Sequence, residues 1–219
     1  MTVFKVGDIV TIKSHPLLSS PPKKIKEFSA QVPPLMLVKE VVFEKEDKKK
    51  VFSSEIENAQ VADLIKYICV YFDANKSVFI EKEVYHSLLE SYLKLNYYRN
   101  PDEDKKKIDL EKQLIPEVSK YKLVTEYLFG KKVQFKTKKL EHRKSYDSGY
   151  EKVNTSFQTP DFILSGIKNE DKKDMFFQDG KPKRIASNQS YKIMWFNHFQ
   201  QKFSEHYLPK EFFVEGLEI

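Results

Sequence analysis

The sequence predicts a mainly β fold with an α connector, in which two tandem small β-barrels are joined by a helical segment. Two observations support this prediction. Three blocks of the first half recur in the same order in the second half. Within the blocks, apolar and polar residues alternate as half-buried strands require. The predicted division is a first barrel over 1–92, a connector over 93–128 and a second barrel over 129–219.

The repeat extends over most of each half. The paired blocks are 7–14 with 130–137, 34–41 with 160–167, and 67–89 with 191–213. They begin as "GDIVTIKS" and "GKKVQFKT", "PLMLVKEV" and "PDFILSGI", and "YICVYFD" and "YKIMWFN". Offsets of 123, 126 and 124 residues differ only where loops fall. An internal duplication explains three blocks in one order.

Each copy is predicted to start with a strand that follows a glycine. In the first copy Ile9, Val10 and Ile12 alternate with polar residues, and in the second copy Val133 and Phe135 do the same. This alternation is typical of a strand with one face in a core.

Turn-forming residues separate the later strands of each copy. Pro34 and Pro160 precede β-rich runs, where a missing N–H donor is tolerated. The segments "DANK" (73–76) and "NHFQ" (197–200) lie between two strand patterns, so each predicts a hairpin. Short strands at this spacing indicate a strongly bent sheet or barrel of about five strands.

The segment between the copies changes character. It opens at the turn Asn100–Pro101, and acidic residues then precede lysines, an order that suits a helix dipole. Pro116 interrupts the pattern and Gly130 ends it. We expect a helical connector over 93–128 that holds the two barrels in a fixed relation. The alternative is a flexible charged linker.

The phrases "GDIVTIKS", "PPLMLVKEV" and "ICVYFD" resemble small bacterial proteins of the YodC type, whose function is not established. The resemblance implies two tandem SH3-like small β-barrels and no particular activity. It covers roughly 6–45 and 66–90, and more faintly the second copy. The chain departs from that family by long insertions after the first strand and by Tyr71 in place of a Trp. The second copy restores the Trp as Trp195 but has Ile193 where the family has Cys.

Composition excludes several classes of function. The single cysteine of 219 residues, Cys69, excludes an internal disulfide framework, and no apolar run is long enough for a secretory signal or a membrane span. We therefore expect a cytoplasmic protein without a membrane partner. No glycine-rich phosphate loop, metal-ligand spacing or nucleophile–base set occurs, so no catalytic residue, metal or cofactor is predicted. Cys69 aligns with Ile193, which favours a core position.

Positive charge is concentrated in the second copy. Residues 131–144 hold seven Lys or Arg against one Glu, which equals the net charge of +6 for the whole chain. The long loops 15–33 and 138–159 occupy the same place in the two copies, and the second mixes basic with aromatic residues. The alternative is a solvated lysine-rich face. The predicted nucleic-acid-binding residues are Lys131, Lys132, Lys138, Lys139, Arg143, Lys144, Lys181, Lys183 and Arg184.

Aromatic residues suggest a second kind of contact surface. If Val70 and Phe72 point into the first barrel, strand alternation turns Tyr71 outward, and the same argument turns Trp195 outward in the second copy. The alternative is that both rings lie beneath the connector or against the other domain, since a lone Trp in a two-domain protein is often buried at the junction. The predicted aromatic binding surface consists of Tyr71, Tyr146, Tyr150 and Trp195.

These features predict a non-enzymatic tandem-barrel adaptor that contacts nucleic acid through the basic second barrel. The first alternative is a protein–protein interaction module that binds a partner peptide or strand as a subunit of a larger complex. An enzyme site within the inserted loops is the second alternative.

Overall fold

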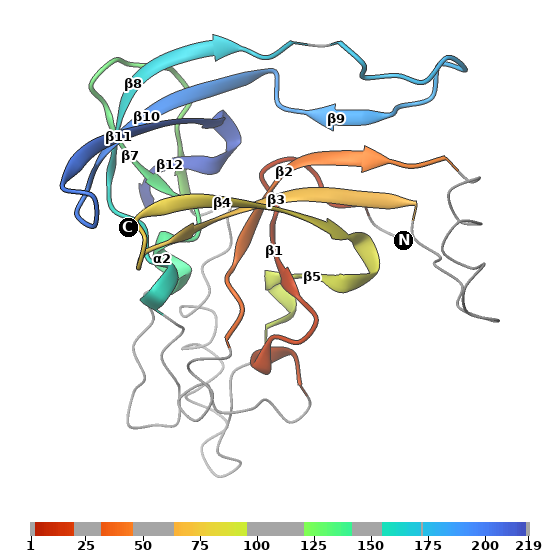
Figure 1. Ribbon diagram of the computed structural model, residues 1–219, viewed down its shortest axis with the longest axis horizontal. Coiled ribbons are helices and arrows are strands. Elements are labelled where there is room, and N and C mark those ends of the chain that lie inside the picture. Colours follow the sequence, from red (N-terminus) through yellow and green to blue (C-terminus); the bar gives the residue numbers. More distant parts are fainter. Residues whose placement is uncertain are drawn as a thin grey trace.

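The computed structural model describes residues 3–19, 32–45, 64–95, 121–141, 155–171 and 173–217 of the chain. These residues form two antiparallel sheets of six strands each, so the predicted mainly β fold is confirmed. In Figure 1 the cyan and blue strands of the second sheet lie above the orange and yellow strands of the first. No helix among the described residues is long and apolar enough to span a bilayer.

The first unit contributes five strands in the order β4-β3-β2-β1-β5. Its elements are β1 (Ile9–Ile12), η1 (Pro16–Leu18), β2 (Met36–Phe43), β3 (Ile65–Asp73), β4 (Val78–Tyr85), η5 (His86–Leu88), β5 (Leu89–Ser91) and η6 (Tyr92–Lys94). The sixth strand of this sheet, β9 (Arg184–Ala186), comes from the second half of the chain and pairs with β2.

The second unit forms a sheet in the order β11-β10-β8-β7-β12-β6. Its elements are β6 (Tyr121–Leu123), β7 (Lys132–Phe135), α2 (Lys138–Glu141), η9 (Thr155–Phe157), β8 (Phe162–Asn169), β10 (Gln189–Asn197), β11 (Lys202–Pro209), η10 (Lys210–Phe212) and β12 (Phe213–Leu217). Apart from β6, the strand order is the one found in the first unit, with β7, β8, β10, β11 and β12 in place of β1 to β5.

The two sheets also share their pairing register. Phe72 lies opposite Phe79 in the first hairpin, and Phe196 lies opposite Phe203 in the second. Both long strands carry one unpaired extra residue, at Lys39 in β2 and at the equivalent position in β8. A bulge of this kind bends the strand and fixes its register. The two units therefore repeat the same strand pairing as well as the same residue pattern.

Backbone geometry explains why a glycine and a turn-forming Asp or Asn occur at equivalent positions of the two units. Gly7 and Gly130 both have φ near +80°, a conformation that side chains disfavour. The Gly7 N–H donates to the Val38 carbonyl in β2 and the Gly130 N–H to the Leu164 carbonyl in β8, both at 2.8 Å. In the two hairpin turns, Asp73 and Asn197 each accept two backbone N–H bonds through a side-chain oxygen. These side chains fold the predicted turns locally.

The prediction of two closed barrels with separate interiors is wrong. Among the described residues neither sheet closes on itself. The larger buried cluster draws residues from both units, whereas the smaller one belongs to the first unit alone. Each sheet has an inner face, which carries Cys69 in the first unit and Ile193 in the second, and an outer face on its other side. The outer face of the first sheet packs on the inner face of the second.

The junction is centred on the β3–β4 hairpin of the first unit. The ring of Phe79 lies 5.5 Å from Trp195, 5.5 Å from Phe162 and 5.4 Å from Phe135, all on the inner face of the second sheet. At the tip of the hairpin, the Ser77 carbonyl accepts hydrogen bonds from the Trp195 indole N–H at 3.2 Å and from the Asn197 side-chain amide at 3.0 Å. The first unit thus fills the interior of the second.

The predicted helical connector over 93–128 is only partly described. Lys94 ends the 3-10 turn η6, and Tyr121–Leu123 form the strand β6, which pairs with β12. The far end of this segment is therefore a strand and not a helix. Residues 96–120 lie outside the described residues.

Equivalent phenylalanines give a matched test of the junction. Phe72 is 2% exposed on the outer face of the first sheet, and its equivalent Phe196 is 49% exposed. We expect Phe72→Ala to lower the free energy of unfolding by about 3–5 kcal/mol, because it opens a cavity in the shared core. Phe196→Ala should lower it by about 0.5 kcal/mol or less. Urea denaturation of both variants measures the free energy of unfolding. Equal losses of stability in the two variants would contradict the packing of the first sheet's outer face on the second sheet.

Candidate functional site

The basic residues at the start of the second unit are paired with carboxylates. Lys131 and Lys122 both bind Glu215, and these bonds lower the pKa of that carboxyl. Lys132 and Lys138 both lie within ion-pair distance of Asp161. A phosphate backbone would have to compete with these partners, so this part of the stretch does not form the unpaired positive face that the sequence predicts.

The other predicted basic residues are dispersed. Arg184 in β9 forms an ion pair with Glu40 of the first unit, with Nε 2.7 Å from Oε2. Lys181 lies 3.8 Å from Asp179 in an exposed turn, and Lys183 belongs to the same hairpin. Lys139 is exposed on α2. Arg143, Lys144, Tyr146 and Tyr150 lie outside the described residues.

The predicted outward orientation of Trp195 is wrong. Its side chain is 6% exposed and its indole N–H donates to Ser77, because the hairpin of the first unit covers the inner face on which it lies. Tyr71 is half-buried and packs edge-on against Phe157 at 5.6 Å. Both rings therefore lie at the junction of the two units, which was the alternative interpretation.

The aromatic surface that is exposed lies on the outer face of the second sheet. Phe196 on β10 and Phe203 on β11 are 49% and 70% exposed, and their rings meet edge-to-face at 5.6 Å. Met194 and Ile163 lie beside them, partly buried, and Tyr207 extends the apolar surface along β11. We call these five residues the open face.

The face of the first unit that is equivalent to the open face is covered by the second unit. The residues equivalent to Ile163, Met194, Phe196 and Phe203 are Leu37, Val70, Phe72 and Phe79, and these belong to or pack against the shared core. The ring pair that packs at the junction is thus repeated, edge-to-face in both units, on a surface exposed to solvent. Exposed apolar clusters are common at interaction sites, which makes the open face the candidate surface.

Charges around the open face are mutually compensated. Lys192 forms an ion pair with Glu205, which raises the pKa of the lysine and lowers that of the carboxyl. Lys168 lies 3.3 Å from Glu170 and 4.9 Å from the centre of the Tyr207 ring. The Lys192–Glu205 pair lies within the open face, because Glu205 is opposite Met194 and Lys192 is opposite Tyr207, whereas the Lys168–Glu170 pair lies beyond them along β8. Compensated pairs beside apolar side chains are found in protein interfaces.

Sequence reasoning missed the open face because both faces of β10 are apolar. Alternation placed Met194 and Phe196 inside, whereas the structure places Trp195 inside and Phe196 outside. Phe203, in the register opposite Phe196, was the available signal, since a half-buried hairpin does not need a ring on its solvent side.

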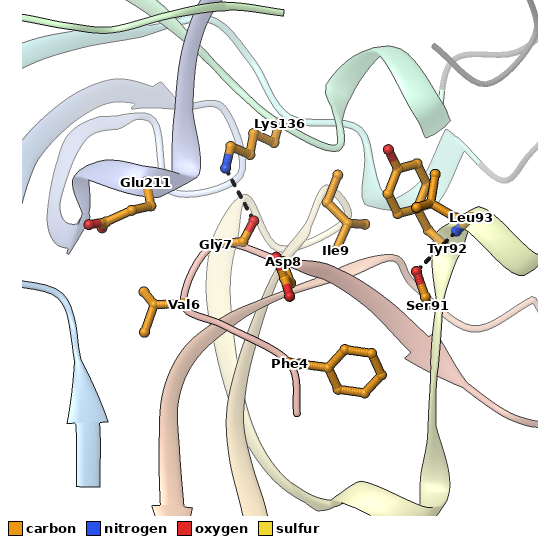
Figure 2. Close-up of a pocket in the computed structure, with 10 residues that line it drawn as sticks. All are labelled: Phe4, Val6, Gly7, Asp8, Ile9, Ser91, Tyr92, Leu93, Lys136 and Glu211. Atoms are coloured by element: carbon orange, nitrogen blue, oxygen red, sulfur yellow. Dashed lines mark hydrogen bonds between the residues drawn. The ribbon is translucent and has the colours of Figure 1, made fainter. Parts of the chain in front are cut away.

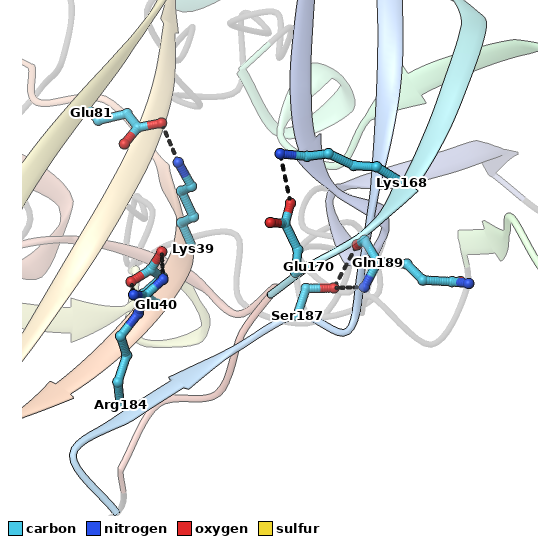
Figure 3. A network of polar contacts seen from close by, with 8 residues as sticks. All are labelled: Lys39, Glu40, Glu81, Lys168, Glu170, Arg184, Ser187 and Gln189. Atoms are coloured by element: carbon cyan, nitrogen blue, oxygen red, sulfur yellow. Dashed lines mark hydrogen bonds and ion pairs between the residues drawn. The ribbon is translucent and has the colours of Figure 1, made fainter. Parts of the chain in front are cut away.

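Polar contacts fasten the inserted strand β9 to the first unit (Figure 3). Glu40 on β2 accepts a bond from Arg184 Nη2 at 2.9 Å, and neighbouring Lys39 reaches Glu81 on β4 at 2.6 Å. On the second unit, Ser187 Oγ donates to the Gln189 carbonyl at 2.7 Å where β10 begins. Of these contacts, the Arg184–Glu40 pair joins the insertion to the first unit, whereas Lys39–Glu81 lies within that unit.

A cavity of about 480 Å³ lies where the two units meet (Figure 2). Its walls are mostly apolar, but they include Lys136, which is 8% exposed and donates to the Gly7 carbonyl at 3.2 Å. Burial lowers the pKa of this amine, and the charges of Asp8 and Glu211 oppose the shift. A Cβ at Gly7 would lie 2.7 Å from Glu211 Cβ, so a glycine is required for the close approach of the units.

Among the described residues, the arrangement of possible metal ligands and the reactivity of the cysteine thiol bear on catalysis. No three His, Cys, Asp or Glu side chains among them lie close enough together to hold a metal ion. Cys69 is fully buried, as its alignment with Ile193 predicts, and burial raises the pKa of its thiol to about 12. Such a thiol is an inert core group at neutral pH.

Comparisons of the chain with protein-family models, curated proteins and solved structures found no match in any of the three. The two units of the chain therefore serve as references for each other. Positions that are covered in one unit and exposed in its equivalent define the candidate surface.

Lys136 gives a test of the buried junction. We expect Lys136→Met to raise the free energy of unfolding by about 1 kcal/mol at pH 7, because a desolvated cation is replaced by an apolar chain of similar length. The folded pKa of Lys136 lies below its unfolded value of 10.5. Between these two values the unfolded chain keeps a proton that the folded chain has lost, so the stability of the wild type rises with pH. The wild type therefore regains this stability toward pH 10.5, and the gain from the substitution shrinks.

The exposed equivalent of Lys136 in the first unit, Lys13, supplies the control. Lys13→Met should change stability by about 0.5 kcal/mol or less at any pH. Chemical denaturation of both variants from pH 7 to about 10 measures the difference. A loss of stability in Lys136→Met at pH 7 would show that the amine stabilises the junction.

Proposed function

We propose that the protein is a non-enzymatic interaction module that binds a partner protein through the open face. The observation that supports this is the contrast between equivalent ring pairs. Phe72 and Phe79 are covered by the second unit, whereas Phe196 and Phe203 are exposed at the same places in the fold. Aromatic rings at the centre of a surface with a polar rim are where binding energy concentrates in protein interfaces.

The charges favour a protein over a polyanion. Around the open face, Lys192 and Lys168 each have a carboxylate partner, and Lys132 lies 3.8 Å from Asp161. A single-stranded nucleic acid needs cations that are available for phosphates beside the rings on which bases stack. Compensated pairs suit the rim of a protein complex instead, where they set orientation.

Nucleic acid is the second candidate, and one observation favours it. Lys202 is exposed at the start of β11, next to Phe203, and Phe199 is exposed in the adjoining turn. Exposed rings with a lysine at the same end of one hairpin are elements of a stacking site. This version of the adaptor uses the outer face of the second sheet and not the paired lysines of 131–138.

We further propose that each unit is an SH3-like module of the type that the YodC resemblance implies, with an open sheet. Five antiparallel strands in one order, with one bulge position, support a common architecture for the two units. Two such modules fused head to tail present one covered and one available copy of the same surface. That arrangement suits an adaptor subunit of a larger complex.

The double variant Phe196→Ser/Phe203→Ser tests the open face. Tagged chain immobilised at equal density is used to capture partners from the native host, with and without nuclease treatment. We expect the double variant to lose a nuclease-resistant protein partner, because removal of two central rings costs at least about tenfold in Kd. Phe176→Ser, which removes an exposed ring on the β9 hairpin, is the matched control and should retain it.

The outcomes separate the two candidates. Loss of capture on nuclease treatment, with nucleic acid recovered from the wild type, would favour the second candidate. An unchanged set of captured proteins in the double variant would contradict the assignment of the open face.

A further inference from the structure

The first sheet gains a strand from outside its own unit. In the loop between β8 and β10, β9 crosses to β2 and pairs with it antiparallel, with Val41 opposite Ile185 and Val42 opposite Arg184. Next along the strand, the Phe43 N–H donates to the Lys183 carbonyl at 2.9 Å. In Figure 1, β9 runs beside the orange strand β2. The edge of β2 is thereby extended by strand addition within one chain.

The equivalent edge of β8 has no such strand. Gly166, Ile167 and Lys168 take the places of Glu40, Val41 and Val42, and on one side they pair with β10. On the other side, no strand among the described residues pairs with them. The side chain of Ile167 is 41% exposed, and those of Lys168 and Asn169 are exposed as well.

Backbone directions show that the unpaired groups point outward. The Glu44 N–H donates to the Leu64 carbonyl at 2.7 Å, and the equivalent Glu170 N–H donates to the Asn188 carbonyl at 3.0 Å. Even-numbered residues of this part of β8 therefore bond to β10. Because directions alternate along a strand, the N–H and C=O groups of Ile167 and Asn169 face away from the sheet.

We infer that the outer edge of β8 at 166–169 is a docking site for an extended strand of a partner protein, added antiparallel as β9 is added to β2. Exposed strand edges are templates for such pairing, in which main-chain bonds supply affinity and alternate side chains supply specificity. The first unit provides the precedent within the same molecule, and its bulge at the same position gives the two edges the same bend.

Side chains along the edge specify the chemistry of the partner strand. At β2, Glu40 binds Arg184 of β9. At β8, that glutamate is replaced by Gly166, and Val42 is replaced by Lys168, so the position that faces Arg184 in the first unit becomes a lysine, which lies 3.3 Å from Glu170 of the same edge. The incoming strand is therefore expected to carry a carboxylate where β9 carries Arg184, and an apolar residue where β9 carries Ile185, opposite Ile167.

This inference goes beyond the proposed function and does not depend on it. The open face binds through side chains on the outer surface of the sheet, whereas the β8 edge binds through main-chain groups. A chain with a defective open face retains the edge, and the reverse also holds. The two proposals can therefore fail separately.

A peptide designed on β9 tests the edge. The probe is a fluorescein-labelled peptide with the sequence of residues 181–188 and Glu in place of Arg184, titrated with the full chain and followed by anisotropy. The glutamate of the peptide would be repelled by Glu40 on β2, so the peptide is not expected to replace β9 there. We expect binding with a Kd on the order of 10–100 μM, and at least about tenfold weaker binding of the peptide that keeps Arg.

The decisive variant is Ile167→Pro. It removes an outward N–H group that makes no hydrogen bond to β10, so the pairing of β8 with β10 is kept. We expect it to abolish peptide binding while its thermal unfolding midpoint stays close to that of the wild type. The double variant Phe196→Ser/Phe203→Ser should bind the peptide as the wild type does. In the wild type, the peptide should slow amide hydrogen exchange at Ile167 and Asn169, a readout that decides the matter if Ile167→Pro does not fold.

Three results would overturn the inference. They are no anisotropy change at about 1 mM chain, unchanged binding by a folded Ile167→Pro variant, and exchange protection that appears elsewhere but not at Ile167 and Asn169.

Discussion

The packing of one aromatic ring pair into the neighbouring sheet determines most of the structure. Phe72 and Phe79 of the first unit enter the inner face of the second, where Phe79 meets Trp195, and Ser77 accepts the indole N–H. This contact merges the two interiors into one large cluster. It also explains why the only tryptophan is unavailable to a ligand, and why a glycine is required where the chain passes Glu211 at the junction.

Head-to-tail stacking of two alike units leaves the last one with unmatched surfaces. Such heterologous contacts do not close on themselves, in contrast to an isologous pair that covers the same patch on both partners. The outer face of the first sheet is covered by the second unit, and its β2 edge is covered by β9. The second unit has the same face and the same edge, and neither is covered by any other strand among the described residues. Both candidate sites thus arise from position in the stack and not from a distinctive local sequence.

Local features of the fold were predictable and long-range features were not. The hairpin turns at 73–76 and 197–200, and the strands that follow Gly7 and Gly130, are encoded by neighbouring residues. The orientation of "KIMWF" was not, because β10 is apolar on both faces and alternation gives no direction when neither face is polar. Charge counting over 131–144 could not show which lysines are paired for a related reason, since the partner of Lys131 is Glu215, which lies far along the chain.

The central claim is that the two units form one cooperative structure through a shared core. Differential scanning calorimetry of the full chain, with the ratio of calorimetric to van't Hoff enthalpy as the readout, tests it most directly. The account predicts a single transition with a ratio of about 1. Two resolved transitions, or a ratio of about 2, would show that each unit closes around an interior of its own and would contradict the account.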